Sequence, residues 1–140
     1  MSRKVQSGFT LIELVVVITI LGILAAFAVP RFASLEVSAR SASIQALAGS
    51  LRSGAALSHA LWLAQGQPPT VLMEGNTITL ANGYPDLGTI DDTLADLSGF
   101  AYVPGTGVFS KTGAINCTVT YAAAAAANTA PTVAMNSTCN

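Results

Sequence analysis

Few residues of this chain have the types and spacing that catalysis requires. His59 is the only histidine, and it falls in a stretch with helical periodicity, where a packed or surface histidine is far commoner than a general base. The sequence contains no cysteine and histidine spacing typical of a metal site, no glycine-rich phosphate loop followed by lysine, and no nucleophile elbow. We therefore expect a protein that is not an enzyme and that uses no cofactor.

Aspartates crowd one later segment of the chain and are its best candidates for binding a cation: Asp86, Asp91, Asp92 and Asp96. Calcium is held by about six to eight oxygens, usually from a flexible loop. The spacing of these aspartates fits no calcium-loop motif. A solvated acidic face is therefore favoured over a calcium site, and no metal ligand is assigned.

The two cysteines, Cys117 and Cys139, both lie near the C-terminus. In an exported protein such a pair is expected to form one disulfide, whereas a cytosolic protein would keep it reduced. A closed loop of this length would stabilise a small domain by roughly 3 kcal/mol. It would also tie down a chain end that otherwise frays.

The N-terminal segment carries positive charge and then a long apolar run. Arg3 and Lys4 come first, and almost every residue from Phe9 to Val29 is apolar. As a helix this run measures about 31 Å, enough to cross the hydrocarbon core of a membrane and too long for a secretory signal. Two features argue against a plain membrane anchor. Glu13 lies inside the run, where a carboxylate without a partner is costly, and the small residue Gly8 comes before the run.

The segment from Ser7 to Val17, SGFTLIELVVV, resembles the cleavage and methylation signature of type IV pilins and of the related type II secretion pseudopilins, and the likeness continues to Phe32. The resemblance implies that a prepilin peptidase cuts between Gly8 and Phe9 and that Phe9 is then N-methylated. It also implies that Glu13 guides assembly by pairing with the Phe9 amine of a neighbouring subunit. The short leader, residues 1–8, fits the type IVa class.

Gly22 and Pro30 are the expected weak points of this helix. Proline lacks an N–H and its ring clashes with the carbonyl four residues back, and glycine raises the cost of staying helical. Filaments of the family that this chain resembles are unwound between such residues, so the resemblance implies local unwinding here. A simple kink at the proline is the alternative.

Beyond Pro30 the pattern predicts an amphipathic helix and then a small β-rich domain. Apolar residues recur at three- and four-residue steps from Ile44 to Trp62, and Gln65–Pro69 cannot continue a helix, so one helix is expected over about residues 9–64. A short helix is expected over residues 91–97, whereas residues 122–127 fit either a helix or a loop. Strands are expected over residues 70–73, 77–81, 100–103, 108–110, 117–121 and 132–135.

The predicted fold is α+β: a long N-terminal helix, transmembrane and then amphipathic, packs on a small antiparallel sheet, as in the type IV pilin fold. The chain divides into a leader (1–8), a transmembrane or filament-core helix (9–30), and a globular head (31–140) built on the second half of the helix. Composition agrees with these two environments, since 51% of the 140 residues are apolar and 9% are charged. Ordinary soluble domains have about 25% charged residues.

The resemblance implies a structural subunit of a type IV pilus that serves surface adhesion or motility. Its expected partners are copies of itself in a helical filament, the prepilin peptidase, the pilus assembly platform and inner-membrane lipid before assembly. The mature subunit would then lie in an extracellular pilus on the cell surface. The segments 31–35, 83–85 and 117–121 resemble the mannose-sensitive haemagglutinin type of pilin, and in pilins a C-terminal disulfide loop faces the filament exterior.

Two alternatives remain at this point. A pseudopilin of a type II secretion system would share the whole N-terminal pattern. A minor pilin that takes up DNA is the other, but the net charge is −1 and Lys111 is the only basic residue after Arg52. Since nucleic-acid binding depends on basic residues that contact phosphates, no nucleic acid partner is expected.

Overall fold

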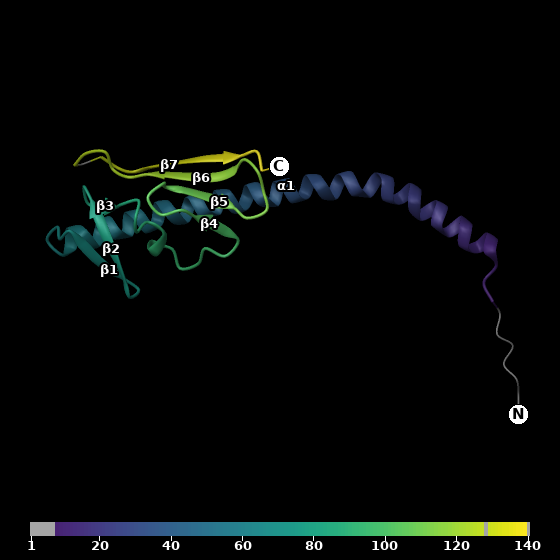
Figure 1. Ribbon diagram of the computed structural model, residues 1–140, viewed down its shortest axis with the longest axis horizontal. Helices are drawn as coiled ribbons and strands as arrows, with labels where there is room; N and C mark the ends of the chain where they lie inside the picture. The colour runs from purple at the N-terminus through teal and green to yellow at the C-terminus, as the bar shows by residue number, and fades with distance from the viewer. Residues whose placement is uncertain (1–7, 128, 140) are drawn as a thin grey trace, which may run out of the picture. The chain divides into compact units, whose positions relative to one another are not determined.

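The computed structural model describes residues 8–127 and 129–139 and divides into two compact units, one ending at Glu36 and the other beginning at Val37. A single helix, α1 (Leu11–Ala64), contributes to both units. All the strands follow α1 in the chain and lie in the second unit (Figure 1).

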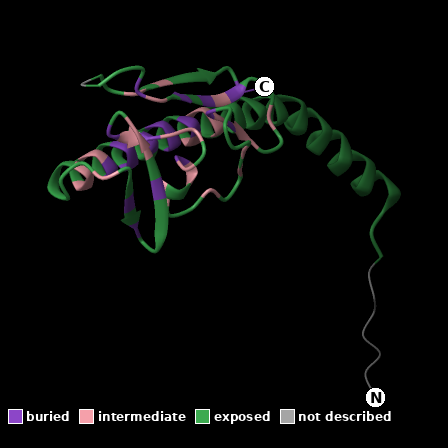
Figure 2. Cartoon of the chain, turned by 60° about the vertical axis from the view of Figure 1, so that its left-hand side comes forward, coloured by how far each residue is buried: buried purple, intermediate pink, exposed green. Residues whose placement is uncertain are grey.

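In the first unit, residues 11–36 belong to α1 and leave their apolar surface uncovered. All of residues 11–36 are exposed, as the unbroken green of this part of α1 shows (Figure 2). An 18-residue window of α1 has a mean hydropathy of 2.8 and none of it is buried. By length and composition this helix is able to cross a membrane. It begins at Leu11, two residues later than predicted.

In the second unit α1 is amphipathic, as predicted. Its buried apolar residues are spaced three and four apart, so they form one stripe that faces the sheets: Ile44, Leu47, Ala48, Leu51 and Ala55. The predicted stop after Ala64 is also confirmed. Gly66 and Gln67 both have positive φ angles, and the Gln67 N–H donates to the Trp62 carbonyl at 2.8 Å, which closes the end of the helix.

The head contains two antiparallel sheets rather than the single sheet that was predicted. The first has the order β1-β2-β3, with β1 (Thr70–Met73), β2 (Asn76–Ala81) and β3 (Tyr84–Pro85). The second has the order β4-β5-β6-β7, with β4 (Phe100–Tyr102), β5 (Val108–Lys111), β6 (Cys117–Ala122) and β7 (Thr132–Ser137).

The strand missing from the prediction is β3. It has only two residues and includes a proline, so it carries no alternating pattern. What holds it beside β2 is the tight turn at Asn82 and Gly83, whose φ angles of 55° and 85° suit a two-residue hairpin connection.

The two sheets pack on the same half of α1. The larger core joins the helix stripe to Phe109, Val119 and Tyr121, whereas a smaller core joins Val71 and Ile78 of the first sheet to the helix. The Tyr121 hydroxyl donates to the Pro85 carbonyl at 2.8 Å, which links β6 to β3 inside the protein. The predicted α+β architecture, a long apolar helix on small antiparallel sheets, is confirmed.

The predicted helix over residues 91–97 is wrong in extent. Only a single 3-10 turn, η1 (Asp91–Thr93), forms, and Leu94 is already extended, with φ −102° and ψ 132°. The Asp96 carboxylate accepts hydrogen bonds from the Ser98 N–H at 2.8 Å and the Ser98 hydroxyl at 2.6 Å. Aspartate used in this way stabilises a turn in competition with a helix.

The alanine-rich segment after β6 forms no helix within its described residues, despite its high helix propensity. Ala124 is buried, and its carbonyl accepts a hydrogen bond from the Asn82 side-chain amide at 2.8 Å. Contacts with a distant turn therefore override the local preference of this segment.

Candidate assembly site at the start of the helix

Gly8 and Phe9 lie on exposed, non-helical backbone immediately before α1. The Phe9 side chain is 91% exposed, and no atom approaches within 4 Å of the position where a Cβ would stand on Gly8. A protease requires backbone that is accessible and outside regular structure, and this segment is both. The remainder of the predicted leader, including Arg3 and Lys4, lies outside the described residues.

Glu13 has a local hydrogen-bond partner, which the sequence reasoning did not identify. Its carboxylate accepts from the Thr10 N–H at 2.8 Å and from the Thr10 hydroxyl at 2.7 Å, while the Thr10 hydroxyl oxygen lies 3.3 Å from the Glu13 N–H. This is a capping box, in which threonine and glutamate satisfy each other's backbone donors. The signal was present in the sequence as a threonine followed by glutamate at the third position, ahead of an apolar run.

The surroundings of Glu13 are otherwise apolar. Phe9, Ile12, Val16 and Val17 line a shallow depression of about 420 Å³ together with Glu13. A charged group placed at this point sits beside one carboxylate and among hydrocarbon side chains.

Gly22 and Pro30 lie within continuous α-helix in the single chain. Nothing approaches within 4 Å of the Cβ position of Gly22. The hydroxyl of nearby Thr19 donates to the Val15 carbonyl at 2.7 Å, so this polar group is satisfied within the helix. The unwinding implied for this stretch concerns the filament and stays a prediction.

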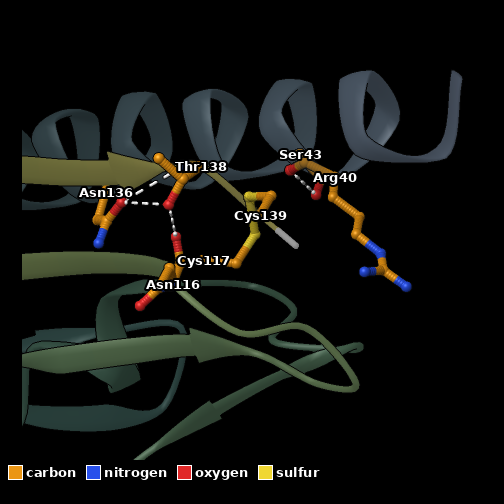
Figure 3. The surroundings of a disulfide bond; sticks show 7 residues. All are labelled: Arg40, Ser43, Asn116, Cys117, Asn136, Thr138 and Cys139. Carbon is orange, nitrogen blue, oxygen red and sulfur yellow. Dashed lines mark hydrogen bonds between the residues drawn. A yellow bond between two sulfur atoms is a disulfide. The ribbon is translucent and has the colours of Figure 1, made fainter. Parts of the chain in front are cut away.

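Cys117 and Cys139 form a disulfide, which joins β6 to the end of the chain (Figure 3). Both residues are buried. Two hydrogen bonds accompany the bridge, since the Cys139 N–H and the Thr138 hydroxyl both donate to the Asn116 carbonyl, each at 3.2 Å. The predicted pairing is confirmed, and the last described residues are held against the sheet.

His59 is a packed residue, in line with the prediction. Its ring stacks on Tyr84 with a centroid distance of 4.2 Å, and on Trp62 at 5.3 Å. Its Nδ1 lies 2.9 Å from the Gly83 carbonyl oxygen. The ring therefore fastens the β2–β3 turn to α1.

The four aspartates do not converge on one point. The Asp86 carboxylate accepts from the Gly88 N–H and the Thr89 hydroxyl, and Asp96 holds Ser98, whose hydrogen bonds lower the pKa of Asp96. Burial raises the pKa of Asp91, and its Oδ1 accepts no hydrogen bond. Across residues 8–127 and 129–139, no three acidic, histidine or cysteine side chains are grouped as metal ligands.

Comparison with known proteins supports the resemblance of the N-terminal segment to prepilins. Residues 3–29 match the family described as the prokaryotic N-terminal methylation motif. The chain is 54% identical over 50 residues to the type IV narrow pilus major component PilA5 of Thermus thermophilus. The matched segment covers 36% of this chain and 43% of PilA5.

Two further relatives match a segment of similar extent. Type II secretion system core protein G of Pseudomonas aeruginosa is 49% identical over 55 residues, covering 36% of this chain and 39% of the relative. The type IV major fimbrial protein FimA of Dichelobacter nodosus is 44% identical over 50 residues, covering 36% and 31%. The matches thus span less than half the length of these relatives, and no solved structure matches the chain.

The predicted cleavage site, the capping box and the apolar helix all lie in the N-terminal segment that the family matches. The chain carries the N-terminal methylation motif of prokaryotic prepilins, and its homologues over this segment are type IV pilins and a type II secretion pseudopilin.

Proposed function

We propose that this chain is a structural subunit of a type IV pilus and has no catalytic role. The observation that carries the proposal is the uncovered apolar surface of α1 over residues 11–36. Each fully buried large apolar side chain contributes about 1.5–3 kcal/mol relative to exposure in water. A helix of this kind therefore requires lipid or other apolar helices on every side, and a filament core of packed helices supplies the second.

The precursor lies in the inner membrane with its N-terminus in the cytoplasm, because Arg3 and Lys4 favour that side. The prepilin peptidase removes the leader between Gly8 and Phe9, and Phe9 is N-methylated. The exposed, non-helical backbone at this bond supports the step. At the assembly platform the Glu13 carboxylate then pairs with the Phe9 amine of the neighbouring subunit.

The head is displayed outside the cell, where the filament serves adhesion or motility. The Cys117–Cys139 disulfide supports this location, because such bonds persist in oxidising compartments. Adhesion is favoured by three short segments that resemble the mannose-sensitive haemagglutinin type of pilin: residues 31–35, 83–85 and 117–121.

The test is mass spectrometry of filaments sheared from the source cells, with subunit abundance and N-terminus measured together. We expect a dominant protein that begins at methylated Phe9. A chain that still starts at Met1, or a processed chain that is absent from sheared filaments, would overturn the proposal.

A pseudopilin of a type II secretion system is the second candidate, favoured by the likeness to core protein G. In that case the processed chain stays in the membrane fraction and is missing from sheared filaments. Deletion of the gene would then reduce the amount of secreted protein, and filament number would not change.

A further inference from the structure

A groove runs along the head beside α1, between the β1–β2 hairpin and the segment that follows η1. Two adjoining depressions share Leu57, Thr93, Leu94 and Ala95. The larger, with a volume of about 580 Å³, extends toward the hairpin, and the smaller extends along α1 toward Ala46. All of these residues belong to the second compact unit.

At the end near the hairpin the groove combines leucine side chains with a rim of carboxylates. Leu57 is 54% exposed and Leu72 is 64% exposed, so both offer apolar surface to a partner. Glu74 and Asp92 line the same end and are exposed, and neither forms an ion pair within the part of the chain that the structure describes. A fitting occupant is therefore an apolar segment that carries one cation.

Toward its other end the groove is bordered by small side chains of α1. Ala46, Ser50 and Ser53 are exposed and lie on one face, because they are four and three residues apart. Small residues at such spacing allow a second helix to approach closely.

The apolar half of α1 has the matching features. Arg31 is the only basic residue between Phe9 and Glu36, and it follows the apolar run. Among residues 8–127 and 129–139 it has no ion-pair partner. In contrast, Arg52 donates to the Val133 carbonyl at 3.0 Å and Lys111 lies over the Phe100 ring.

We propose that this groove receives the apolar helix of a second copy of the chain, with Arg31 of that copy between Glu74 and Asp92. The inference rests on the proposed filament function and adds the docking face and its register. The contact joins two different surfaces, so it propagates along a filament rather than closing into a dimer.

The register follows from the spacing of side chains on the two helices. If both subunits point the same way, Arg31 of one copy lies level with Leu57 of the other, which sets the offset in residues between the two helices. The large, exposed side chains of Ile20, Leu24 and Phe27 share one helix face with Arg31. At this offset they lie opposite the groove's small residues Ala46, Ser50 and Ser53, in that order.

The first test is a charge exchange in full-length protein expressed in the source cells, with the subunit measured in sheared filaments. Arg31→Glu should lower the filament yield by about tenfold or more, because it places a third carboxylate at the rim. Combining it with Glu74→Lys and Asp92→Lys should restore the yield. The matched control is Arg31→Glu with Asp96→Lys, since Asp96 is exposed in the same segment but does not line the groove. It should restore nothing.

The second test leaves the charges intact and probes the register by cross-linking. Chains that carry Leu24→Cys and Ser50→Cys should form a ladder of disulfide-linked oligomers in sheared filaments. Leu24→Cys with Ala60→Cys, at an exposed position farther along α1, should not. The docking face would be overturned if wild-type filaments are abundant but the lysine exchanges restore no yield and the Leu24→Cys, Ser50→Cys chains form no ladder. The proposed function would then still stand. Absence of the wild-type chain from filaments would overturn both.

Discussion

Removing the Cys117–Cys139 disulfide should destabilise the head by roughly 3 kcal/mol. The two cysteines are separated by 22 residues along the chain, and closing a loop of this length restricts the unfolded chain by about that free energy. Both residues are buried, at 1% and 0% exposure, so replacing them by alanine leaves only a small space behind. For a domain near 100 residues each 1 kcal/mol is worth about 4–8 °C, so the melting temperature should fall by roughly 12–24 °C.

The assay is thermal unfolding of the mature full chain in detergent, followed by the fluorescence of Trp62. This residue is the only tryptophan, and it packs from α1 against the core of the first sheet, so its signal reports the head. The double variant Cys117→Ala with Cys139→Ala is compared with wild type, each with and without reductant. Reductant should lower the melting temperature of the wild type to about that of the variant and should not change the variant.

Two outcomes would refute this reasoning. A decrease equivalent to less than about 1 kcal/mol would mean that the loop hardly restricts the unfolded chain. The melting temperature could also fall in the variant but not in the wild type treated with reductant. The cysteine side chains would then act through packing and not through the bond.

Three further predictions concern single side chains. Glu13→Val should leave cleavage after Gly8 intact but reduce the subunit in sheared filaments, and a normal filament yield would rule out the docking role. Tyr121→Phe removes the hydrogen bond to the Pro85 carbonyl and should destabilise the head by about 1 kcal/mol in urea unfolding, with an unchanged slope; an unchanged midpoint would contradict it. Because burial raises the pKa of Asp91, the protonated form favours folding, and stability is lost as the pH rises through that pKa. Asp91→Asn should therefore melt at a higher temperature than wild type near pH 7 and at nearly the same temperature near pH 3, whereas a variant that is less stable at pH 7 would contradict the sign.

Elements with long, repeated patterns were predictable from the sequence. The apolar run from Phe9, followed by the amphipathic spacing from Ile44 and the stop after Ala64, placed the helix within two residues at each end. The alternating strands were also found, since β6 and β7 differ from the expected ranges only at their C-terminal ends. In each case the signal lies in the segment itself, so no knowledge of distant contacts was needed.

The misses involve contacts between segments that are far apart in the chain. Strand β3 exists because the Asn82–Gly83 turn returns it to β2, and the division into two sheets depends on how both pack against α1. The segment after Asp91 has helical propensity, but Asp96 and Ser98 form a turn instead. At the candidate site the motif predicted Gly8, Phe9 and Glu13, whereas the Thr10 partner of Glu13 was overlooked although its spacing was visible.

The capping box at Thr10 and Glu13 changes what the proposed docking step contributes in free energy. The carboxylate already accepts two hydrogen bonds before any neighbour arrives. Pairing with an amine is then an exchange of partners, and only the difference between the old and new interactions is gained. The cohesion of a filament would come chiefly from the apolar helices, while the carboxylate selects one alignment among many of similar apolar contact. A shift of one helical turn would reduce the buried apolar area only slightly but would leave the amine without its partner. Glu13 would therefore select the correct alignment each time a subunit is added.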